Sequence, residues 1–120
     1  MKSARCRAGR EMNKRLVILE SPYGGSVEQN VEYARKCVRD CLYRGEAPIA
    51  SHLLYTQRGI LEDDIIEERR LGINAGLAWL KVADASVVYV DLGVSAGMLE
   101  GIFMAQSRGV PIEFRRVEDD

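Results

Sequence analysis

The chain has 120 residues, a typical length for one domain, and its 47% hydrophobic and 29% charged residues are ordinary for a globular protein. A formal net charge of −1 gives no general reason to expect a nucleic acid or a membrane surface as partner. No apolar run approaches the roughly 20 residues of a membrane-spanning helix, and the polar, basic N-terminus lacks the apolar region of a signal peptide.

The first fourteen residues lack hydrophobic periodicity. We interpret them as a basic tail that is either frayed or acts as an arm over an anionic ligand or partner, and we expect one domain over residues 15–117. The basic side chains of the tail are Lys2, Arg5, Arg7, Arg10 and Lys14. Cys6, Cys37 and Cys41 cannot all pair within one chain, so we expect reduced thiols and a cytoplasmic location.

The first half of the domain begins with a strand signal and continues as a helix. Residues 15–20 (RLVILE) form an apolar run that predicts a strand buried on both faces. Residues 21–26 (SPYGGS) predict a tight turn, and Ser26 with Gln29 fits a capping box at a helix start. Gly45 is placed as the helix stop. The apolar residues at helical spacing are Val27, Val31, Ala34, Val38, Cys41 and Leu42.

The middle of the chain is less regular. Residues 47–51 (APIAS) predict a short second strand, and residues 52–63 a long loop with room for an extra strand. Asp64 with Glu67 resembles the start of another helix. One stripe of that helix holds Ile66, Arg70, Ile73, Leu77 and Leu80, and a second holds Leu71, Ala75, Ala78 and Val82. A subunit partner could cover the second stripe.

The last third carries the strongest strand signal, residues 85–91 (ASVVYVD), followed by a turn over residues 92–97. A helix with Met98, Ile102 and Ala105 on one face should stop at Gly109, before a last strand over residues 111–115. Alternating strands and helices predict an α/β fold, a doubly wound parallel sheet of four or five strands with helices on both faces, Rossmann-like or flavodoxin-like.

Ligands of such sheets bind beyond the carboxyl ends of the strands, where the strand order reverses. This rule selects residues 21–26, 51–55 and 91–97, which include the loop after the first strand and the loop after the 85–91 strand. That later strand would be the fourth if the long loop held one. The helix-start N–H groups near Gly24 and Gly25 favour an anion such as phosphate, although an ordinary tight turn would look the same.

Other polar and aromatic residues also have two interpretations each. Asp91 could accept ribose hydroxyls or a base amine, and Ser95 could donate to a phosphate, or the two could simply end a strand and cap a helix. His52 is a proton donor or a structural group. Tyr55 and Trp79 stack on a base or fill core, with core favoured for Trp79. A group of acidic residues fits a solvated helix start better than a metal site, so no metal is expected. Its members are Glu62, Asp63, Asp64, Glu67 and Glu68.

Several segments together carry a family resemblance: SPYGG after the first strand with Asn30 downstream, ASHLL, ADASVVYVD, and the closing S-A-G…A…G-V-P-I pattern. Over roughly residues 15–116 the chain resembles the nucleoside 2-deoxyribosyltransferase-like superfamily, and within it the short members found in bacteria and phages. The resemblance implies a Rossmann-like fold, dimers or larger assemblies, and a nucleoside or nucleotide ligand. It also implies N-glycosidic cleavage by a glutamate on the helix after the fourth strand, which attacks the anomeric carbon.

The sequence departs from the superfamily pattern at this glutamate. The pattern has a serine six residues before the glutamate and an alanine four after it, and counting from Ser95 and Ala105 both lead to Gly101. Glu100 stands one residue earlier, about 100° around a helix. Either a local shift brings Glu100 inward, or the pocket binds its ligand and has lost this nucleophile.

Three functions remain open. The first is cleavage or transfer at the N-glycosidic bond of a nucleoside or nucleoside monophosphate, with Glu100 as nucleophile, Asp91 orienting or protonating the base, and His52 as the third catalytic candidate. The ligand-binding candidates are Ser21, Tyr23, Gly24, Gly25, Ser26, Asn30, Tyr55, Ser95, Gly97 and Met98. The second is a nucleotide sensor or sequestering protein without turnover, and the third an oligomeric interaction module. We expect a homodimer or larger homo-oligomer, and no cofactor, membrane or nucleic-acid partner.

Overall fold

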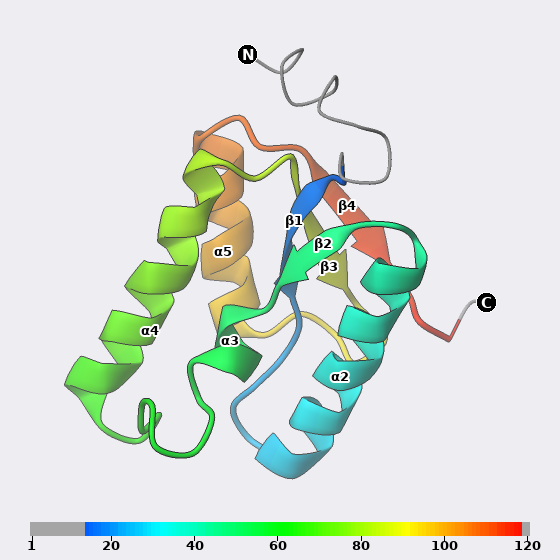
Figure 1. The fold of residues 1–120 in the computed structure, drawn as a ribbon. Helices are drawn as coiled ribbons and strands as arrows, with labels where there is room; N and C mark the ends of the chain where they lie inside the picture. The colour runs from blue at the N-terminus through cyan, green and yellow to red at the C-terminus, as the bar shows by residue number, and fades with distance from the viewer. Residues whose placement is uncertain (1–13, 119–120) are drawn as a thin grey trace.

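The computed structural model describes residues 14–118, which form a four-stranded parallel sheet with helices on both faces (Figure 1). The elements in chain order are β1 (Leu16–Glu20), α2 (Val27–Tyr43), β2 (Ala47–Ile49), α3 (Ser51–Leu54), α4 (Ile66–Ala78), the 3₁₀ turn η1 (Trp79–Lys81), β3 (Ala85–Tyr89), α5 (Ala96–Ser107) and β4 (Ile112–Arg115). The predicted α/β fold class is confirmed. The tail residues 1–13, with Cys6, lie outside the described part. No helix within residues 14–118 is long and apolar enough to cross a membrane.

The strands are ordered β2-β1-β3-β4, all parallel. β3 is buried along its whole length, as a continuous apolar run in a central strand should be. Pro48 lies in β2, an edge strand, where a missing N–H costs the ladder least. The extra strand is not formed: between Ile49 and Ala85 the described chain has none, so the ADASVVYVD strand is the third and not the fourth.

Helix α2 covers one face of the sheet and begins right after Ser26, as predicted, but its cap and its buried side differ from the prediction. The Ser26 side chain makes no capping hydrogen bond, so the capping box is wrong. Val27 and Leu42 are exposed, because the helix turns its tyrosine and cysteines inward instead. Its buried residues are Asn30, Tyr33, Ala34, Cys37 and Cys41. Gly45 ends the helix in the left-handed region at φ +83°, and Gly109 does so after α5.

The segment after β2 also differs. Ser51 begins the short helix α3 instead of ending a strand, and α4 starts after Ile65 without a side-chain cap from Asp64. Ile66, expected to be on a buried stripe, is 81% exposed, and only the later part of that stripe reaches the core, at Leu80. Trp79 is 44% exposed, so its assignment to the core is wrong. The helical periodicity predicted this helix, but it did not show that only the C-terminal end of the stripe packs against the sheet.

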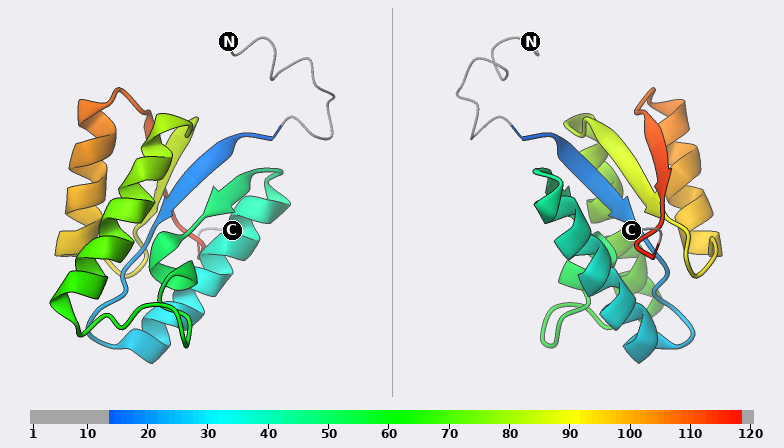
Figure 2. Two further views of the ribbon diagram at one scale, coloured as in Figure 1. Left: turned by 60° about the vertical axis from the view of Figure 1, so that its left-hand side comes forward. Right: turned by 90° about the vertical axis from the view of Figure 1, so that its right-hand side faces the viewer.

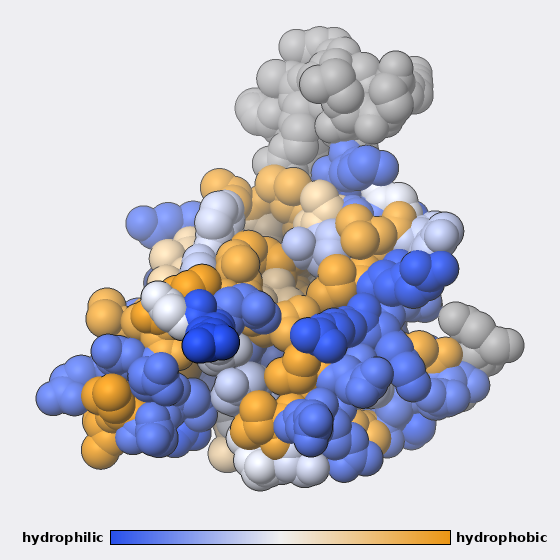
Figure 3. All heavy atoms as spheres, turned by 60° about the horizontal axis from the view of Figure 1, so that its bottom comes forward, coloured by the Kyte–Doolittle hydropathy of each residue, from blue (hydrophilic) through white to orange (hydrophobic). Residues whose placement is uncertain are grey.

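Two hydrophobic clusters lie on opposite faces of the sheet. Figure 2 shows helix α2 on one side of the sheet and helices α4 and α5 on the other. One cluster lies under α2 and α3 and includes Val17, Leu19 and Tyr89. The other lies under α4, η1 and α5 and includes Ile18, Leu80 and Ala105. The side of the molecule where the strands end comes forward in Figure 3, where apolar atoms run through the middle between hydrophilic groups on both sides. Opposite faces of β1 thus serve both clusters, as alternation along a strand requires.

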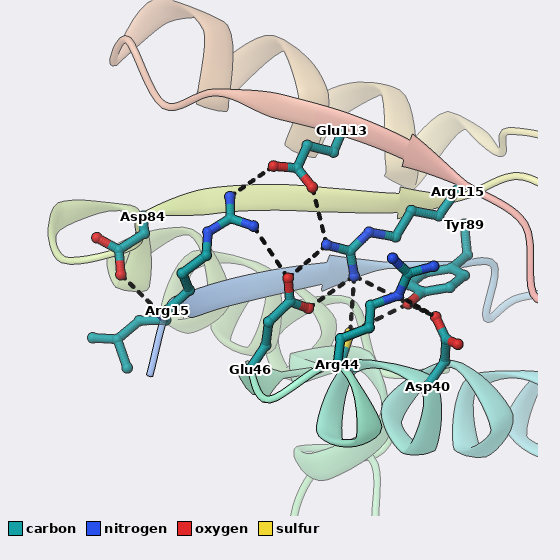
Figure 4. A network of polar contacts seen from close by, with 10 residues as sticks. Arg15, Asp40, Arg44, Glu46, Asp84, Tyr89, Glu113 and Arg115 are labelled. Atoms are coloured by element: carbon teal, nitrogen blue, oxygen red, sulfur yellow. Dashed lines mark hydrogen bonds and ion pairs between the residues drawn. The ribbon is translucent and has the colours of Figure 1, made fainter. Parts of the chain in front are cut away.

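A buried ion pair joins the end of β4 to the residue before β2 (Figure 4). The Arg115 guanidinium donates from Nη1 to Glu46 Oε1 at 2.8 Å and from Nη2 to Glu46 Oε2 at 2.6 Å, and both side chains are only 7% exposed. Arg115 also donates to the hydroxyl oxygen of Tyr89 at 3.3 Å and to Glu113 at 2.9 Å. This two-point contact ties together segments that belong to the two edge strands of the sheet.

Removing one partner of this pair leaves the other buried without its counter-charge. Glu46→Gln should therefore lower the free energy of unfolding by about 3–5 kcal/mol, measured by urea denaturation. Arg15→Ala is the control, since Arg15 contacts Glu46 at 3.2 Å from a side chain that is 45% exposed, and it should cost no more than about 1 kcal/mol. Equal effects of the two variants would contradict the importance of the buried pair.

Candidate functional site

A cavity of about 330 Å³ opens at the carboxyl end of β1, between α3, α4 and the first turns of α5. β1 and β3 are neighbours at the point where the strand order reverses, so the cavity lies at the expected ligand position of a doubly wound sheet. Its volume is within the range of small-molecule sites. Its walls combine apolar side chains, among them Ile18, Leu77 and Leu80, with a limited set of polar groups.

Glycines bring the helices close around this cavity. A Cβ atom on Gly76 of α4 would overlap Oγ of Ser51 and lie 2.8 Å from its Cβ, so only glycine lets α4 approach α3 here. A Cβ atom on Gly101 of α5 would overlap Oε2 of Glu20 and lie 2.7 Å from Cδ of Glu20. The absence of a side chain at position 101 therefore provides the space that the Glu20 carboxyl occupies.

Glu20, the last residue of β1, is the functional candidate that sequence reasoning missed. Its carboxyl lines the cavity, and no group within residues 14–118 donates a hydrogen bond to it. Burial raises the pKa of the Glu20 carboxyl to about 8, and the negative charge of Glu100 adds to the increase. At neutral pH the group is mainly a neutral carboxylic acid. Its only sequence signal was a charged residue ending an otherwise apolar strand.

Glu100 also lines the cavity, from α5, and its surroundings are the opposite. Its Oε2 atom accepts a hydrogen bond from Nη1 of Arg70 at 3.1 Å, and the Glu100 side chain is 39% exposed. The one-residue offset from position 101 thus places Glu100 on the open side of the cavity, paired with a cation of α4. The cavity therefore holds two carboxyl groups, one half-buried and unpaired, the other exposed and ion-paired.

His52 and Ser21 form a hydrogen-bonded pair in the same wall. The Oγ atom of Ser21 lies 2.6 Å from Nε2 of His52. Burial lowers the pKa of His52 to about 4, so the imidazole is neutral at physiological pH. A base this weak activates a serine poorly, and we interpret the pair as neutral hydrogen-bonding groups directed at a ligand.

The N-terminus of α5 borders the cavity with Ser95, Ala96 and Gly97. The Ser95 hydroxyl accepts a hydrogen bond from the Met98 N–H at 3.3 Å and so caps the helix, one of the two roles considered for it. The first-turn N–H groups of a helix have no partner within the helix, and this helix end favours an anion. Met98 is buried beneath it.

The structure brings most of the predicted site residues together. Those that line the cavity are Ser21, Tyr23, Gly24, His52, Tyr55, Ser95, Gly97, Met98 and Glu100. Gly25, Ser26, Asn30 and Asp91 are not among the lining residues. The Asn30 amide donates to the carbonyl oxygens of Tyr23 and Gly24, at 3.0 and 2.8 Å, so it shapes the loop that the cavity uses. The hydroxyl of Tyr55 accepts from Nε1 of Trp79 at 3.1 Å.

Asp91 is engaged by the protein itself, on the α2 side of the sheet. Its carboxylate accepts hydrogen bonds from the Tyr33 hydroxyl at 2.6 Å and from the N–H groups of Val117 and Glu118 at 2.9 and 3.0 Å. Burial acts to raise the pKa of Asp91, but these hydrogen bonds outweigh it and hold the pKa below its usual range. The carboxylate thus holds the segment after β4 against the end of β3.

The acidic residues before and in α4 do not gather around one point. The N–H of Glu62 donates to Glu68 at 2.6 Å, and Asp63 lies 4.0 Å from Arg69. Within residues 14–118 no three His, Cys, Asp or Glu side chains come together as metal ligands could. These contacts instead fix the loop that leads into α4.

Comparisons with known proteins place this geometry in context. A family model described as a domain of unknown function, DUF7768, matches residues 15–115. Among curated proteins none matches the sequence. Among solved structures, the chain is similar to a 2-deoxyribosyltransferase from the psychrotolerant bacterium Bacillus psychrosaccharolyticus, a biocatalyst for the synthesis of nucleosides. The TM-score is 0.59 with 19% sequence identity, over 84% of this chain and 72% of that chain. This likeness supports the Rossmann-like fold.

Asp91→Asn tests whether this carboxylate is structural. The amide of asparagine has one NH₂ group in place of a carboxylate oxygen, so it points a donor at one of the N–H or O–H groups that donate to Asp91. We therefore expect the free energy of unfolding to fall by about 1–3 kcal/mol. Tyr33→Phe, which removes one of those donors, is the matched variant, and its free energy of unfolding should also fall. Unchanged stability in urea denaturation would contradict the structural role of Asp91.

Glu20 should make stability depend on pH. The folded state keeps the Glu20 proton up to pH about 8, whereas the unfolded chain releases it near 4.5, so the folded state binds more protons in this window. The stability that Glu20 contributes is therefore complete below pH 4.5 and is lost as pH rises toward 8, by about 1.4 kcal/mol per pH unit.

The Glu20→Gln variant lacks this loss, so its stability relative to the unmodified protein should increase steadily from pH 5 to pH 8 in urea denaturation. Glu32→Gln, at an exposed position of α2, is the control and should run parallel to the unmodified protein. Parallel curves for Glu20→Gln as well would show that Glu20 ionises in its ordinary range.

Proposed function

We propose that this chain, which belongs to the DUF7768 family, binds a nucleoside or nucleoside monophosphate in the cavity beside β1. There it would break the N-glycosidic bond of the ligand or transfer the sugar. The observation that carries this proposal is the Glu100 carboxylate, which lines the cavity one turn inside α5 and pairs with Arg70. A carboxylate is a suitable nucleophile for an anomeric carbon, because the leaving base departs from an oxocarbenium-like centre.

The rest of the cavity suits the parts of such a ligand. The N-terminus of α5, with Ser95 and Gly97, would take a phosphate or the 5′ end of the sugar. The neutral Ser21–His52 pair would hydrogen-bond to sugar hydroxyls or base edges. Tyr23 and Tyr55 are the aromatic groups of the cavity wall and would lie against the base or the ribose. The fold shared with a 2-deoxyribosyltransferase supports this choice of ligand class.

One specific observation favours a second function, nucleotide binding without turnover. The superfamily pattern puts its nucleophile at position 101, where this chain has glycine. A sensor or sequestering protein would keep the cavity and need no nucleophile. An enzyme would release the base from a bound nucleoside and would need Glu100 to do so. A protein that only binds would leave the nucleoside intact whether or not Glu100 is present.

We further propose a cytoplasmic homo-oligomer. The outer side of α4 and η1 exposes apolar side chains, with Leu71 at 60%, Trp79 at 44% and Val82 at 47%. On α5, Leu99 and Phe103 are 58% and 67% exposed and lie one turn apart. Apolar groups in these numbers are suited to contact with a second copy of the chain.

Nucleosides and nucleoside monophosphates should raise the melting temperature, because a ligand that binds only the folded state stabilises it. At ~100 times its dissociation constant the gain is roughly 2.7 kcal/mol. Each ligand that raises the melting temperature is then incubated with the protein, and free base is quantified by chromatography. Base release supports N-glycosidic chemistry, and binding without release supports the sensor or sequestering function. No shift across the panel would contradict the nucleotide site and favour an interaction module.

A Glu100→Ala variant separates the two functions further. If Glu100 is the nucleophile, base release should fall by at least about 100-fold while the ligand-induced melting shift persists. Glu32→Ala, on the exposed side of α2, is the control and should keep both. Unchanged release in Glu100→Ala would remove Glu100 as the nucleophile.

A further inference from the structure

We propose that Glu20, held in the space left by Gly101, is the general acid that protonates the departing base, while Glu100 attacks the sugar. This assignment rests on the proposed N-glycosidic chemistry and adds a second catalytic residue to it. It follows from the placement of the two carboxyl groups in one cavity and from their unlike surroundings.

β1 and α5 together set the space in which the Glu20 carboxyl lies. β1 delivers the side chain from the centre of the sheet, and α5 lies so close that a Cβ atom at position 101 would overlap the Glu20 carboxyl. A buried carboxyl costs free energy unless it is paired, and Glu20 has no hydrogen bond to any group within residues 14–118. A polar group placed in a ligand-sized cavity without a protein partner is suited to a partner on the ligand.

The charged groups around Glu20 and Glu100 differ: the negative charge of Glu100 favours a protonated Glu20, whereas Glu100 has the cation of Arg70 beside it. The charged groups of the cavity wall besides these two are Asp63, Glu68 and Arg69, from the loop before α4 and from α4 itself. Arg69 lies 4.0 Å from Asp63, and Arg70 pairs with Glu100 at 3.1 Å, so neither arginine serves Glu20. His52 from α3 is neutral. Of two carboxyl groups in such different surroundings, the unpaired one is suited to donate a proton and the one beside a cation is suited to attack the sugar.

The resulting reaction balances. As the bond from C1′ to the base nitrogen breaks, its electron pair goes to the base, and the base takes the proton of the Glu20 carboxyl. The Glu100 carboxylate forms an ester bond with C1′. Water then adds to C1′ and gives a proton to the Glu20 carboxylate, and the ester bond breaks to release Glu100 as carboxylate. Both residues return to their first state, and one water molecule is consumed.

The test is Glu20→Gln, which keeps the shape of the side chain but cannot donate this proton. With natural nucleosides, kcat/KM should fall by about 10²–10⁴-fold. With a 4-nitrophenyl glycoside of ribose or deoxyribose, whose leaving phenolate needs no proton, it should stay within about 5-fold. The unmodified protein should lose activity on natural nucleosides above pH about 8, and this loss should be absent in the residual activity of the variant.

Two further variants complete the design. Glu100→Gln should lose activity on both substrate classes. Gly101→Ala forces the Glu20 carboxyl out of its place, and should lower kcat/KM on natural nucleosides more than on the nitrophenyl glycoside. Thermal melting shows that each variant is folded. As a readout independent of turnover, carboxyl NMR of the glutamate-labelled protein should show one signal titrating near pH 8 that is missing in Glu20→Gln.

The failures are distinguishable. If the unmodified protein releases base but Glu20→Gln matches it on natural nucleosides, or loses both substrates equally, Glu20 is not the general acid and the proposed function stands. A Glu20 carboxyl that titrates near its ordinary value also overturns the assignment, with or without turnover. If the unmodified protein releases no base from any substrate, the proposed function fails and the general acid with it.

Discussion

The Glu20 carboxyl and a side chain at position 101 cannot occupy the same space, and the candidate site depends on this constraint. With glycine at position 101, α5 packs directly over the end of β1 and the carboxyl fills the gap. The same contact shields Glu20 from part of the surrounding water, places it in the cavity, and brings it near enough to Glu100 for the two carboxyl groups to interact. One missing Cβ atom thereby links the packing of a helix to the chemistry of a carboxyl.

The fold brings these residues together from distant parts of the sequence. Parallel strands end at one edge of the sheet, so the end of β1 meets the start of α5, about eighty residues later, at the switch in strand order. The α2 side of the sheet provides a rigid frame. There Glu46 and Arg115 join the segments of the two edge strands, and Asp91 fastens the chain after β4 to the end of β3. The polar networks on the α2 face of the sheet thus hold the structure together, while the unpaired Glu20 carboxyl lies on the α5 face.

Much of the fold could be predicted from the sequence, because the two central strands are short, mainly apolar runs. The residues of β1 and β3 were identified, and so was the buried face of α5 at Met98 and Ala105. The helix starts near Ser26 and Asp64 were predictable, but their caps were not, since neither side chain makes a capping hydrogen bond. Whether such a side chain turns back to the helix depends on the backbone of the preceding loop, which periodicity does not report.

The loops of the candidate site could be predicted from the sequence, but the buried side of Glu20 could not. The switch-point rule selected the segments that supply Ser21, His52 and Ser95, because it depends only on topology. Asp91 was selected by the same rule, but a residue after a strand can turn to either face, and this one turns toward Tyr33. Glu20 was read as part of a strand. Glu20 is shielded only once α5 packs over the end of β1, and the sequence of β1 does not show this contact. The spacing from Ser95 and Ala105 pointed to position 101, where a carboxyl does lie, but it belongs to Glu20 and not to a residue of α5.

The most direct measurement is a crystal structure of the Glu100→Gln variant with an intact nucleoside monophosphate. We expect the base next to Glu20, with a base nitrogen or oxygen within roughly 2.6–3.2 Å of its carboxyl. We also expect C1′ to face residue 100 and the phosphate to lie at the N-terminus of α5. A nucleotide bound outside this cavity, or one that turns its phosphate toward Glu20, would contradict the roles proposed for Glu20 and Glu100.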